Sequence, residues 1–263
     1  MDARAQRFGG IERLYGKHSL SRLASTRVAV IGLGGVGSWV VEALVRSGVG
    51  RLLLVDLDDI CVTNTNRQIH ALDGEYGRPK TDSLLERCKK INPDCDILPV
   101  EEFLTEMNAD RLLASGLDYV VDAIDDVPHK ALLLARCKSI NIPVVTTGGA
   151  GGKRDPTQIL VSDLAITSHD GLAKSVRKLL RKNYEFPAPP ALFGIECVHS
   201  REAAVYPDST GGTCIQPEAG SSLKMDCASG LGAAVYVTAT FGLIAASRVV
   251  HHLTCSNIQA QQR

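Results

Sequence analysis

The 263-residue sequence has no excess of charge of either sign and no closely spaced cysteines. Its 29 basic and 29 acidic side chains cancel, which excludes a uniformly basic surface for binding nucleic acid. Eight cysteines are scattered without a Cys-x-x-Cys pair, which argues against a structural zinc ribbon. The N-terminus, Met1 to Arg4, also lacks the apolar core of a secretion signal. Together with the scattered cysteines, this favours a cytoplasmic protein.

The sequence also lacks internal repeats and low-complexity linkers, so we expect a single domain. One apolar run, residues 231–250, has nearly the length of a membrane span and carries no charge before Arg248. It is rich in Gly, Ala and Thr and poor in Leu and Ile, which gives weak membrane insertion. We therefore expect a core or dimer-interface helix here, and no stable membrane insertion.

Apolar segments with strand and helix patterns alternate along most of the first 150 residues, and one further strand pattern follows. The pattern predicts strands at 28–31, 52–55, 97–100, 119–123, 144–147 and 159–161, and helices at 36–47, 80–91, 109–114 and 128–138. Such alternation is typical of an α/β fold, Rossmann-like, with a mostly parallel sheet and helices on both faces. A C-terminal elaboration follows the glycine-rich stretch 148–152. Within it, the loop-rich stretch 187–230 is predicted to form a surface that orders around substrate.

A glycine-rich turn separates the first predicted strand from the first helix of this pattern. Its glycines are Gly32, Gly34, Gly35 and Gly37. Glycines let the backbone approach a polyphosphate closely, and the following helix N-terminus offers free N–H groups. The next strand ends in Asp56, where a ribose-binding carboxylate is expected. The sequence therefore predicts a nucleotide site.

Several polar and charged residues beyond the second strand distinguish between possible nucleotides. Arg67 and Lys80 supply positive charge, and Asn64 and Gln68 supply neutral donors. A nicotinamide pocket does not need such a set, whereas a triphosphate carries about four negative charges to be neutralised during attack at phosphorus. We therefore expect ATP and disfavour an NAD-dependent oxidoreductase. A catalytically silent nucleotide-binding protein is disfavoured because the phosphate-handling residues are all present.

Two further acidic residues complete this set. Asp58 follows Asp56 in an Asp-x-Asp pattern, and Asp125 follows the fourth strand. The carboxyl edge of a parallel sheet is a suitable place for a carboxylate that holds Mg²⁺ beside bound phosphates. We therefore predict Asp125 as the metal ligand.

In order and spacing, these motifs resemble the ubiquitin-activating-type adenylyltransferase superfamily. The resemblance implies that Asp56 binds ribose, that Asn64, Arg67, Gln68 and Lys80 contact the phosphates, and that Asp125 takes the metal. The sequence departs from the sulfur-carrier activators of that superfamily, because their two zinc-binding Cys-x-x-Cys pairs are absent. Their N-terminal Arg-Tyr-x-Arg-Gln motif is also replaced by a segment starting at Arg7. Arg7 or Arg13 would then have to substitute for their second arginine, which acts across the dimer.

Four longer stretches narrow the resemblance to the bacterial tRNA threonylcarbamoyladenosine dehydratase family; they are residues 7–10, 61–72, 146–152 and 225–230. This resemblance implies ATP-dependent activation of the threonyl carboxylate of N6-threonylcarbamoyladenosine in tRNA, then cyclisation with loss of water. It further implies a homodimer that cooperates with a cysteine desulfurase and sulfur-acceptor system. Residues 1–165 would bind ATP, and residues 166–263 would face substrate and tRNA and dimerise. The alternative is an enzyme that activates the C-terminus of a ubiquitin-like sulfur-carrier protein.

Two features of the C-terminal part remain open to a structural or a functional interpretation. Cys227, between an aspartate and an alanine, is either a packed small residue or a catalytic thiolate that forms an adduct or accepts sulfur. The segment 171–184 predicts an amphipathic helix with five basic residues on one face, which is either a solvated surface or a contact for RNA. The predicted catalytic set is Arg67, Lys80, Asp125 and Cys227.

Overall fold

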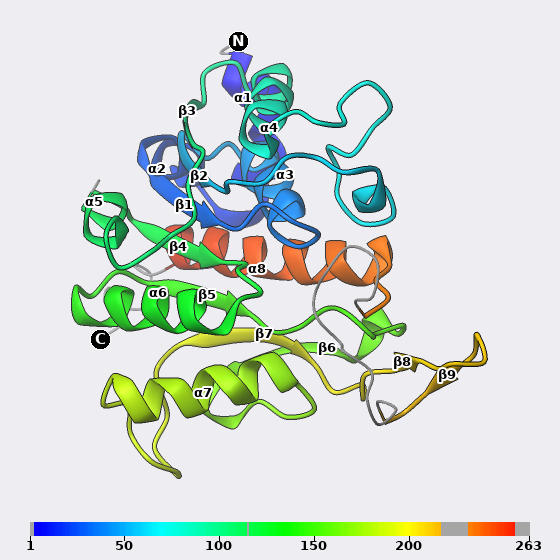
Figure 1. The fold of residues 1–263 in the computed structure, drawn as a ribbon. Coiled ribbons are helices and arrows are strands. Elements are labelled where there is room, and N and C mark those ends of the chain that lie inside the picture. The colour runs from blue at the N-terminus through cyan, green and yellow to red at the C-terminus, as the bar shows by residue number, and fades with distance from the viewer. Residues whose placement is uncertain (1–2, 115, 217–230, 256–263) are drawn as a thin grey trace.

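A computed structural model describes residues 3–114, 116–216 and 231–255. Figure 1 shows a twisted sheet with helices on both of its faces. The strands are β1 Arg27–Ile31, β2 Arg51–Val55, β3 Asp96–Val100, β4 Tyr119–Asp122, β5 Val144–Thr147, β6 Ile159–Asp163, β7 Glu196–Ser200, and a small ribbon of β8 Tyr206–Pro207 and β9 Thr213–Cys214. The α-helices are α1 Ala3–Tyr15, α2 Ser19–Ser25, α3 Gly37–Arg46, α4 Lys80–Ile91, α5 Ala109–Leu113, α6 Val127–Ser139, α7 Gly171–Asn183 and α8 Val235–Cys255.

The order of strands in the main sheet places the predicted nucleotide turn at a crevice. The order is β3-β2-β1-β4-β5-β7-β6, and every neighbouring pair is parallel except the antiparallel β6 and β7. The chain proceeds from β1 to one side and returns to β4 on the other side. In open α/β sheets, ligands bind beyond the carboxyl ends of strands at such a switch point. The predicted fold class is thus confirmed, and the glycine turn after β1 lies at the switch point.

Alternate residues of the central strands feed two separate hydrophobic cores. On one face, Val28 and Val30 pack in the core that contains side chains of α3, α4 and α8. On the other face, Ala29 and Ile31 pack in the core that contains side chains of α5, α6 and α7. Burial on both faces explains why these strands read as continuous apolar runs in the sequence.

Helix α8 confirms the prediction of a core helix over most of residues 231–250. It packs closely on α3, because a Cβ at Gly242 would lie 2.6 Å from the carbonyl oxygen of Val36. The guanidinium of Arg248 forms a bidentate ion pair with Glu196 at the start of β7. None of the helices in the described parts of the chain combines the length and apolar character needed to cross a membrane.

Two parts of the fold differ from the sequence-based expectation. The stretch 187–230 was expected to be loop-rich, but β7 lies within it and is an interior strand between β5 and the edge strand β6. Its polar residues His199 and Ser200 are buried, so its composition does not show a core strand. Residues 217–230 lie outside the described residues. The sequence analysis also did not predict α1 and α2, and in α1 only Phe8 is buried.

Candidate nucleotide site

The glycine turn is held so tightly that two of its positions exclude any side chain. Gly32 has a φ of +88°, and a Cβ there would lie 2.8 Å from the carbonyl oxygen of Ala123. A Cβ at Gly37 would lie 1.8 Å from the carbonyl oxygen of Gly32. The turn therefore folds directly against the end of β4, and α3 starts immediately behind it. This arrangement leaves backbone N–H groups at the helix N-terminus for an anion.

The other two glycines face side chains that the sequence predicted to contact phosphate. A Cβ at Gly35 would lie 3.1 Å from Cδ of Arg67, and one at Gly34 would lie 3.8 Å from Nε2 of Gln68. The segment that follows β2 therefore packs against the glycine turn. The structure brings together Arg67, Gln68 and the turn, as the motif order predicted.

Asp56 joins the glycine turn to the end of β2. Its carboxylate is buried and accepts hydrogen bonds from the backbone N–H of Leu33 at 2.6 Å and of Asp58 at 2.9 Å. The ammonium of Lys80 lies 3.5 Å from Oδ1 of Asp56 and 2.7 Å from Oδ2 of Asp58. Lys80 is the first residue of α4, so the predicted acidic pair and lysine form one charged group at the edge of the sheet.

Asn64 and Arg67 lie on the segment that follows this acidic pair. The side-chain oxygen of Asn64 accepts a hydrogen bond from the N–H of Cys61 at 3.0 Å, which fixes the turn. The carbonyl of Arg67 accepts a bond from Nε1 of Trp39 on α3 at 2.9 Å. Its exposed guanidinium reaches the carbonyl of Thr63 at 2.8 Å. The backbone of Arg67 is thus anchored, while its charge lies at the surface of the crevice.

Asp125 lies in the exposed segment between β4 and α6, next to the same crevice. In the described residues its carboxylate makes no hydrogen bond or ion pair, whereas the neighbouring Asp126 caps α6 by accepting the N–H of His129 at 3.1 Å. The described part of the chain holds no cluster of three or more His, Cys, Asp or Glu residues suited to a metal. Magnesium is commonly held by one or two carboxylates together with substrate phosphates. A free carboxylate beside a phosphate site fits that mode of binding.

A buried ion pair beneath the crevice escaped the sequence analysis. Nζ of Lys130 lies 3.0 Å from Oδ2 of Asp122, the last residue of β4, and both side chains are almost fully buried. Burial raises the pKa of Asp122, while Lys130 and a 2.6 Å hydrogen bond from Thr146 oppose that shift. Lys130 also donates to the carbonyl of Ile124 at 2.8 Å. The pair therefore fixes the backbone immediately before Asp125.

His70 is a second residue that the sequence did not single out. Its imidazole is only 1% exposed, and neither ring nitrogen has a hydrogen-bond partner among the described residues. Burial, reinforced by the positive charges of Lys80 and Arg87, lowers the pKa of His70 to about 4. A neutral histidine thus lies behind the lysine of the site. In the sequence, His70 is a single histidine without metal-ligand spacing, so no pattern indicated that it would be buried beside Lys80.

The N-terminal arginines do not reach this site within the chain. The guanidinium of Arg7 donates to the carbonyl of Ile91 at 3.2 Å, and Ile91 ends the helix that Lys80 begins. A 12-residue helix is roughly 16 Å long, so Arg7 lies at the end away from the site. Arg13 packs against Gly9 of its own helix. Cys227 lies outside the described residues.

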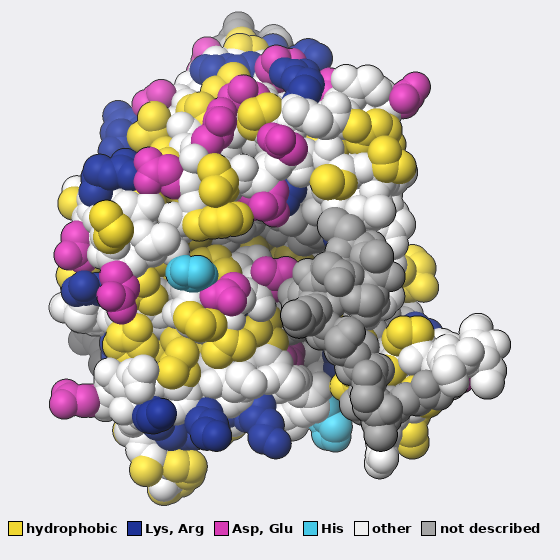
Figure 2. Space-filling view, in the orientation of Figure 1, with side chains coloured by type: hydrophobic (Ala, Val, Ile, Leu, Met, Phe, Trp, Pro, Cys, Tyr) yellow, Lys and Arg dark blue, Asp and Glu magenta, His cyan; other side chains and the backbone are white. Residues whose placement is uncertain are grey.

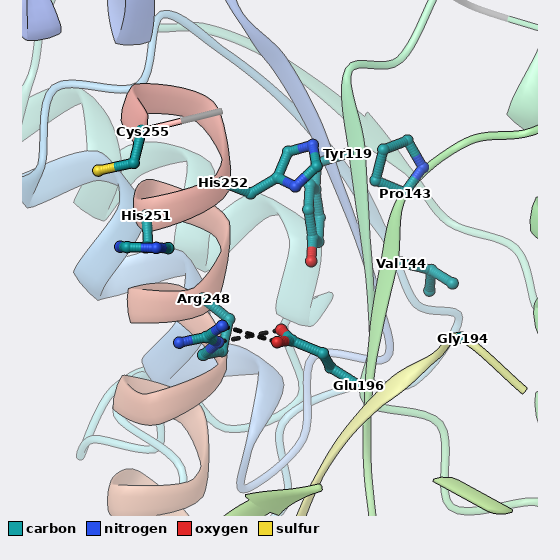
Figure 3. Close-up of a pocket in the computed structure, with 9 residues that line it drawn as sticks. All are labelled: Tyr119, Pro143, Val144, Gly194, Glu196, Arg248, His251, His252 and Cys255. Atoms are coloured by element: carbon teal, nitrogen blue, oxygen red, sulfur yellow. Dashed lines mark hydrogen bonds and ion pairs between the residues drawn. The ribbon is translucent and has the colours of Figure 1, made fainter. Parts of the chain in front are cut away.

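A cavity of about 280 Å³ lies at the opposite edge of the sheet (Figure 3). Tyr119, Val144 and Glu196, which begin β4, β5 and β7, line it from one side, and α8 lines it from the other. In Figure 3, the Glu196–Arg248 ion pair spans the cavity, and the His252 ring lies against that of Tyr119 with centroids 5.0 Å apart. Because the glycine turn follows the carboxyl end of β1, this cavity is separate from the nucleotide site.

The fold and these contacts define a Rossmann-type nucleotide-binding protein whose site carries the cationic and amide side chains of an adenylating enzyme. The chain belongs to the ThiF family, whose sequence profile matches residues 10–261. It is 49% identical over 251 residues to the tRNA threonylcarbamoyladenosine dehydratase of Escherichia coli, covering 95% of this chain and 94% of that protein. It is 50% identical over 254 residues to the dehydratase of the same name from Haemophilus influenzae, covering 96% and 95%.

The fold also matches a solved structure of a relative with bound ATP. The E. coli tRNA N6-threonylcarbamoyladenosine dehydratase in complex with ATP matches this structure with a TM-score of 0.88 and 44% sequence identity. The match covers 98% of each chain. The similarity therefore extends over the nucleotide-binding crevice and the C-terminal elaboration alike.

Proposed function

We propose that this protein is an ATP-dependent dehydratase that cyclises N6-threonylcarbamoyladenosine in tRNA after adenylating its threonyl carboxylate. The observation that carries the proposal is the 49% identity with a dehydratase over 95% of the chain. At that coverage, the similarity includes both the nucleotide crevice and the C-terminal part of the chain. The crevice itself supplies the charges that adenylation requires.

We assign the site residues roles that their positions around the crevice support. Asp56 would accept hydrogen bonds from the ribose, since its carboxylate adjoins the turn at the end of β2. Arg67, Gln68 and Lys80 would neutralise and orient the phosphates, with Asn64 shaping the segment that carries them. Magnesium held by Asp125 and the phosphates would screen the charge of the triphosphate. When ATP binds, Lys80 would exchange part of its contact with Asp58 for a phosphate.

The reaction balances in two steps. An oxygen of the threonyl carboxylate attacks the α-phosphorus of ATP, and the bond to the β-phosphate breaks with release of pyrophosphate. An oxygen or nitrogen of the carbamoyl group then attacks the activated carbonyl carbon, and the carbamoyl group loses one N–H proton. The bond from that carbon to AMP breaks, so the ring closes with the net loss of one water from the nucleoside. The cationic side chains stabilise the charge that develops on the phosphates.

We further propose the setting in which the enzyme works. It acts in the cytoplasm, as a homodimer, and cooperates with a cysteine desulfurase and sulfur-acceptor system. Apolar side chains on the outer face of α8, Tyr236 at 53% and Leu243 at 49% exposure, offer a surface for the second subunit. Because Arg7 lies away from the site of its own chain, it would contact phosphates bound by a second protomer. Residues 1–165 form the ATP-binding part, and residues 166–263 the part that faces substrate and tRNA and dimerises.

Activation of a ubiquitin-like sulfur carrier is the second candidate. No specific observation favours it, because the Cys-x-x-Cys pairs of those activators are absent from the sequence.

The test is a direct assay of the reaction. Purified protein, ATP and Mg²⁺ are incubated with tRNA that carries N6-threonylcarbamoyladenosine. The tRNA is then digested, and the masses of its nucleosides are measured by mass spectrometry. We expect loss of one water with the formation of AMP and pyrophosphate. Arg67→Ala and Asp125→Ala should each lower turnover on the order of a hundredfold at near-normal melting temperature, because each removes an electrostatic contact of the transition state.

Arg51→Ala is the matched control, since Arg51 is an exposed arginine at the other end of β2. Its turnover should equal that of the wild type. If tRNA is unchanged while a sulfur-carrier protein triggers pyrophosphate release, the second candidate replaces the first. If Arg67→Ala keeps normal turnover, its assigned role is wrong.

A further inference from the structure

Helix α7 carries five basic residues, and the structure separates them into two groups. Arg177 contacts the hydroxyl of Thr167 and the carbonyl of Leu164, and Arg181 donates to the carbonyl of Pro187 at 3.0 Å. The guanidinium of Arg181 also lies over the ring of Phe193, 5.0 Å from its centroid. The two arginines are therefore held by contacts within the protein, whereas the sequence analysis grouped all five basic residues on one face.

The three lysines of α7 are free of such contacts. Lys174, Lys178 and Lys182 are exposed and form no ion pair within the described residues. They are four residues apart, so they follow one stripe of the helix with a spacing of about 6 Å and a total span of about 12 Å. Figure 2 shows basic side chains in a row along α7. We name Lys174, Lys178 and Lys182 the lysine row.

The lysine row begins at the same edge of the sheet as the nucleotide site. The carboxylate of Asp170, which caps α7, accepts hydrogen bonds from the N–H of Gly149 at 2.9 Å and of Ala173 at 2.8 Å. Gly149 follows β5 at its carboxyl end, beside β4 and Asp122. Lys174 therefore lies about one helical turn from the edge that carries the site. The far end of α7 packs on Phe193, which precedes the first residue of β7 and so lies toward the opposite edge.

We infer that the lysine row binds successive backbone phosphates of tRNA, along an RNA strand that leads to the nucleotide site. The inference rests on the proposed function, since it assigns a docking surface to the tRNA substrate. Lysines at regular spacing neutralise phosphates without reading sequence, and they fix where a nucleic acid lies on the protein. Because the whole chain has no net charge, attraction to RNA has to come from such a local row.

The remaining side chains of α7 argue against a lipid surface as the partner. The apolar residues Ala173, Val176 and Leu180 are buried in the core, and Leu172 and Leu179 are partly buried and pack against it. Among the described residues, α7 therefore presents no fully exposed apolar side chain to insert into a bilayer. An interfacial membrane helix needs an exposed apolar face beside its basic one. The lysine row therefore offers charge alone, as contact with an RNA backbone requires.

The test measures tRNA affinity of the full-length protein as a function of salt. In the double variant Lys178→Glu/Lys182→Glu, we expect at least tenfold weaker binding at low salt. The slope of log affinity against log salt should also flatten by between one and two, because each phosphate contact contributes roughly 0.7 to 0.9 to that slope. The double variant Lys17→Glu/Lys90→Glu is the charge-matched control. Both lysines are exposed, and Lys90 lies at the end of α4, away from α7 (Figure 1).

The control should bind tRNA as the wild type does, and melting temperature and ATP affinity should be unchanged in both variants. If reversal of Lys178 and Lys182 leaves affinity and slope at wild-type values while the wild type dehydrates tRNA, the docking surface is wrong and the proposed function stands. An equal loss in the control variant would also overturn the inference, since the effect would then be one of net charge. If the wild type neither binds nor dehydrates modified tRNA, the proposed function itself fails.

Discussion

Acid stability provides a sensitive test of the site's interior, through His70. Its imidazole is 1% exposed and its pKa is lowered from 6.5 to about 4, first by burial and then by Lys80 and Arg87. In the unfolded chain, His70 takes up a proton near pH 6.5, whereas in the folded protein it stays neutral to about pH 4. The unfolded state therefore binds more protons between these values. The stabilisation is complete above pH 6.5 and is lost as pH falls toward 4.

The size of this effect follows from the shift. A pKa difference from 6.5 to about 4 is worth about 3 kcal/mol, at roughly 1.4 kcal/mol per pH unit. The free energy of unfolding should be measured by urea titration at several values between pH 7 and pH 4. The wild type should lose about 3 kcal/mol more over this range than His70→Leu, which has no group to titrate there. Comparing the two proteins cancels the contributions of the other ionisable groups.

The matched control is His251→Leu, because His251 is exposed on α8. It should follow the wild-type pH dependence. If His70→Leu and the wild type lose the same free energy on acidification, His70 is not held neutral by burial and the reasoning fails.

Three further predictions concern the crevice. Lys130→Met should lower the free energy of unfolding by about 3–5 kcal/mol in urea titration, because Asp122 is left buried without its partner. The double variant Asp122→Asn/Lys130→Met should recover much of that loss if the two side chains are energetically coupled. Gly37→Ala should lower the free energy of unfolding by about 1–3 kcal/mol through overpacking, and ATP should no longer raise its melting temperature. Gly171→Ala is the control, because open space surrounds that position, and it should change neither quantity. ATP at about 100 times its dissociation constant should stabilise the protein by about 2.7 kcal/mol in thermal melting; stabilisation by NAD with ATP inert would contradict the assignment.

The nucleotide half of the fold could be predicted from the sequence because its signals are local. Continuous apolar runs indicated the central strands, and the helix predicted at 80–91 has the observed bounds of α4, Lys80–Ile91. Strand β7 could not be predicted in this way. Its Glu196 is paired with Arg248, 52 residues later, and its His199 contacts Ser162 on β6 at 2.8 Å. Distant partners make these polar residues suitable for a core strand, and no local pattern reveals them.

The same distinction applies to the candidate site. Asp56, Asp58 and Lys80 all follow β2, and the sequence predicted that they lie together beyond its carboxyl end, where ligands bind in such sheets. The sequence did not indicate Asp122, Lys130 or His70 as site residues, because their effect on the site depends on their complete burial. Burial depends on the packing of whole elements, and a single sequence does not report it for a polar residue.

The place of β7 in the sheet constrains how the chain is completed during synthesis. Among the described strands, β6 pairs with β7 alone, and β7 follows it by more than 30 residues. As the chain leaves the ribosome, β6 and α7 emerge before the strand that connects them to the sheet exists. The edge of β5 stays open over the same interval. A truncation between residues 166 and 195 would therefore leave an unpaired edge on β5 and a β6 without its partner, so such a fragment would be prone to pair with other chains.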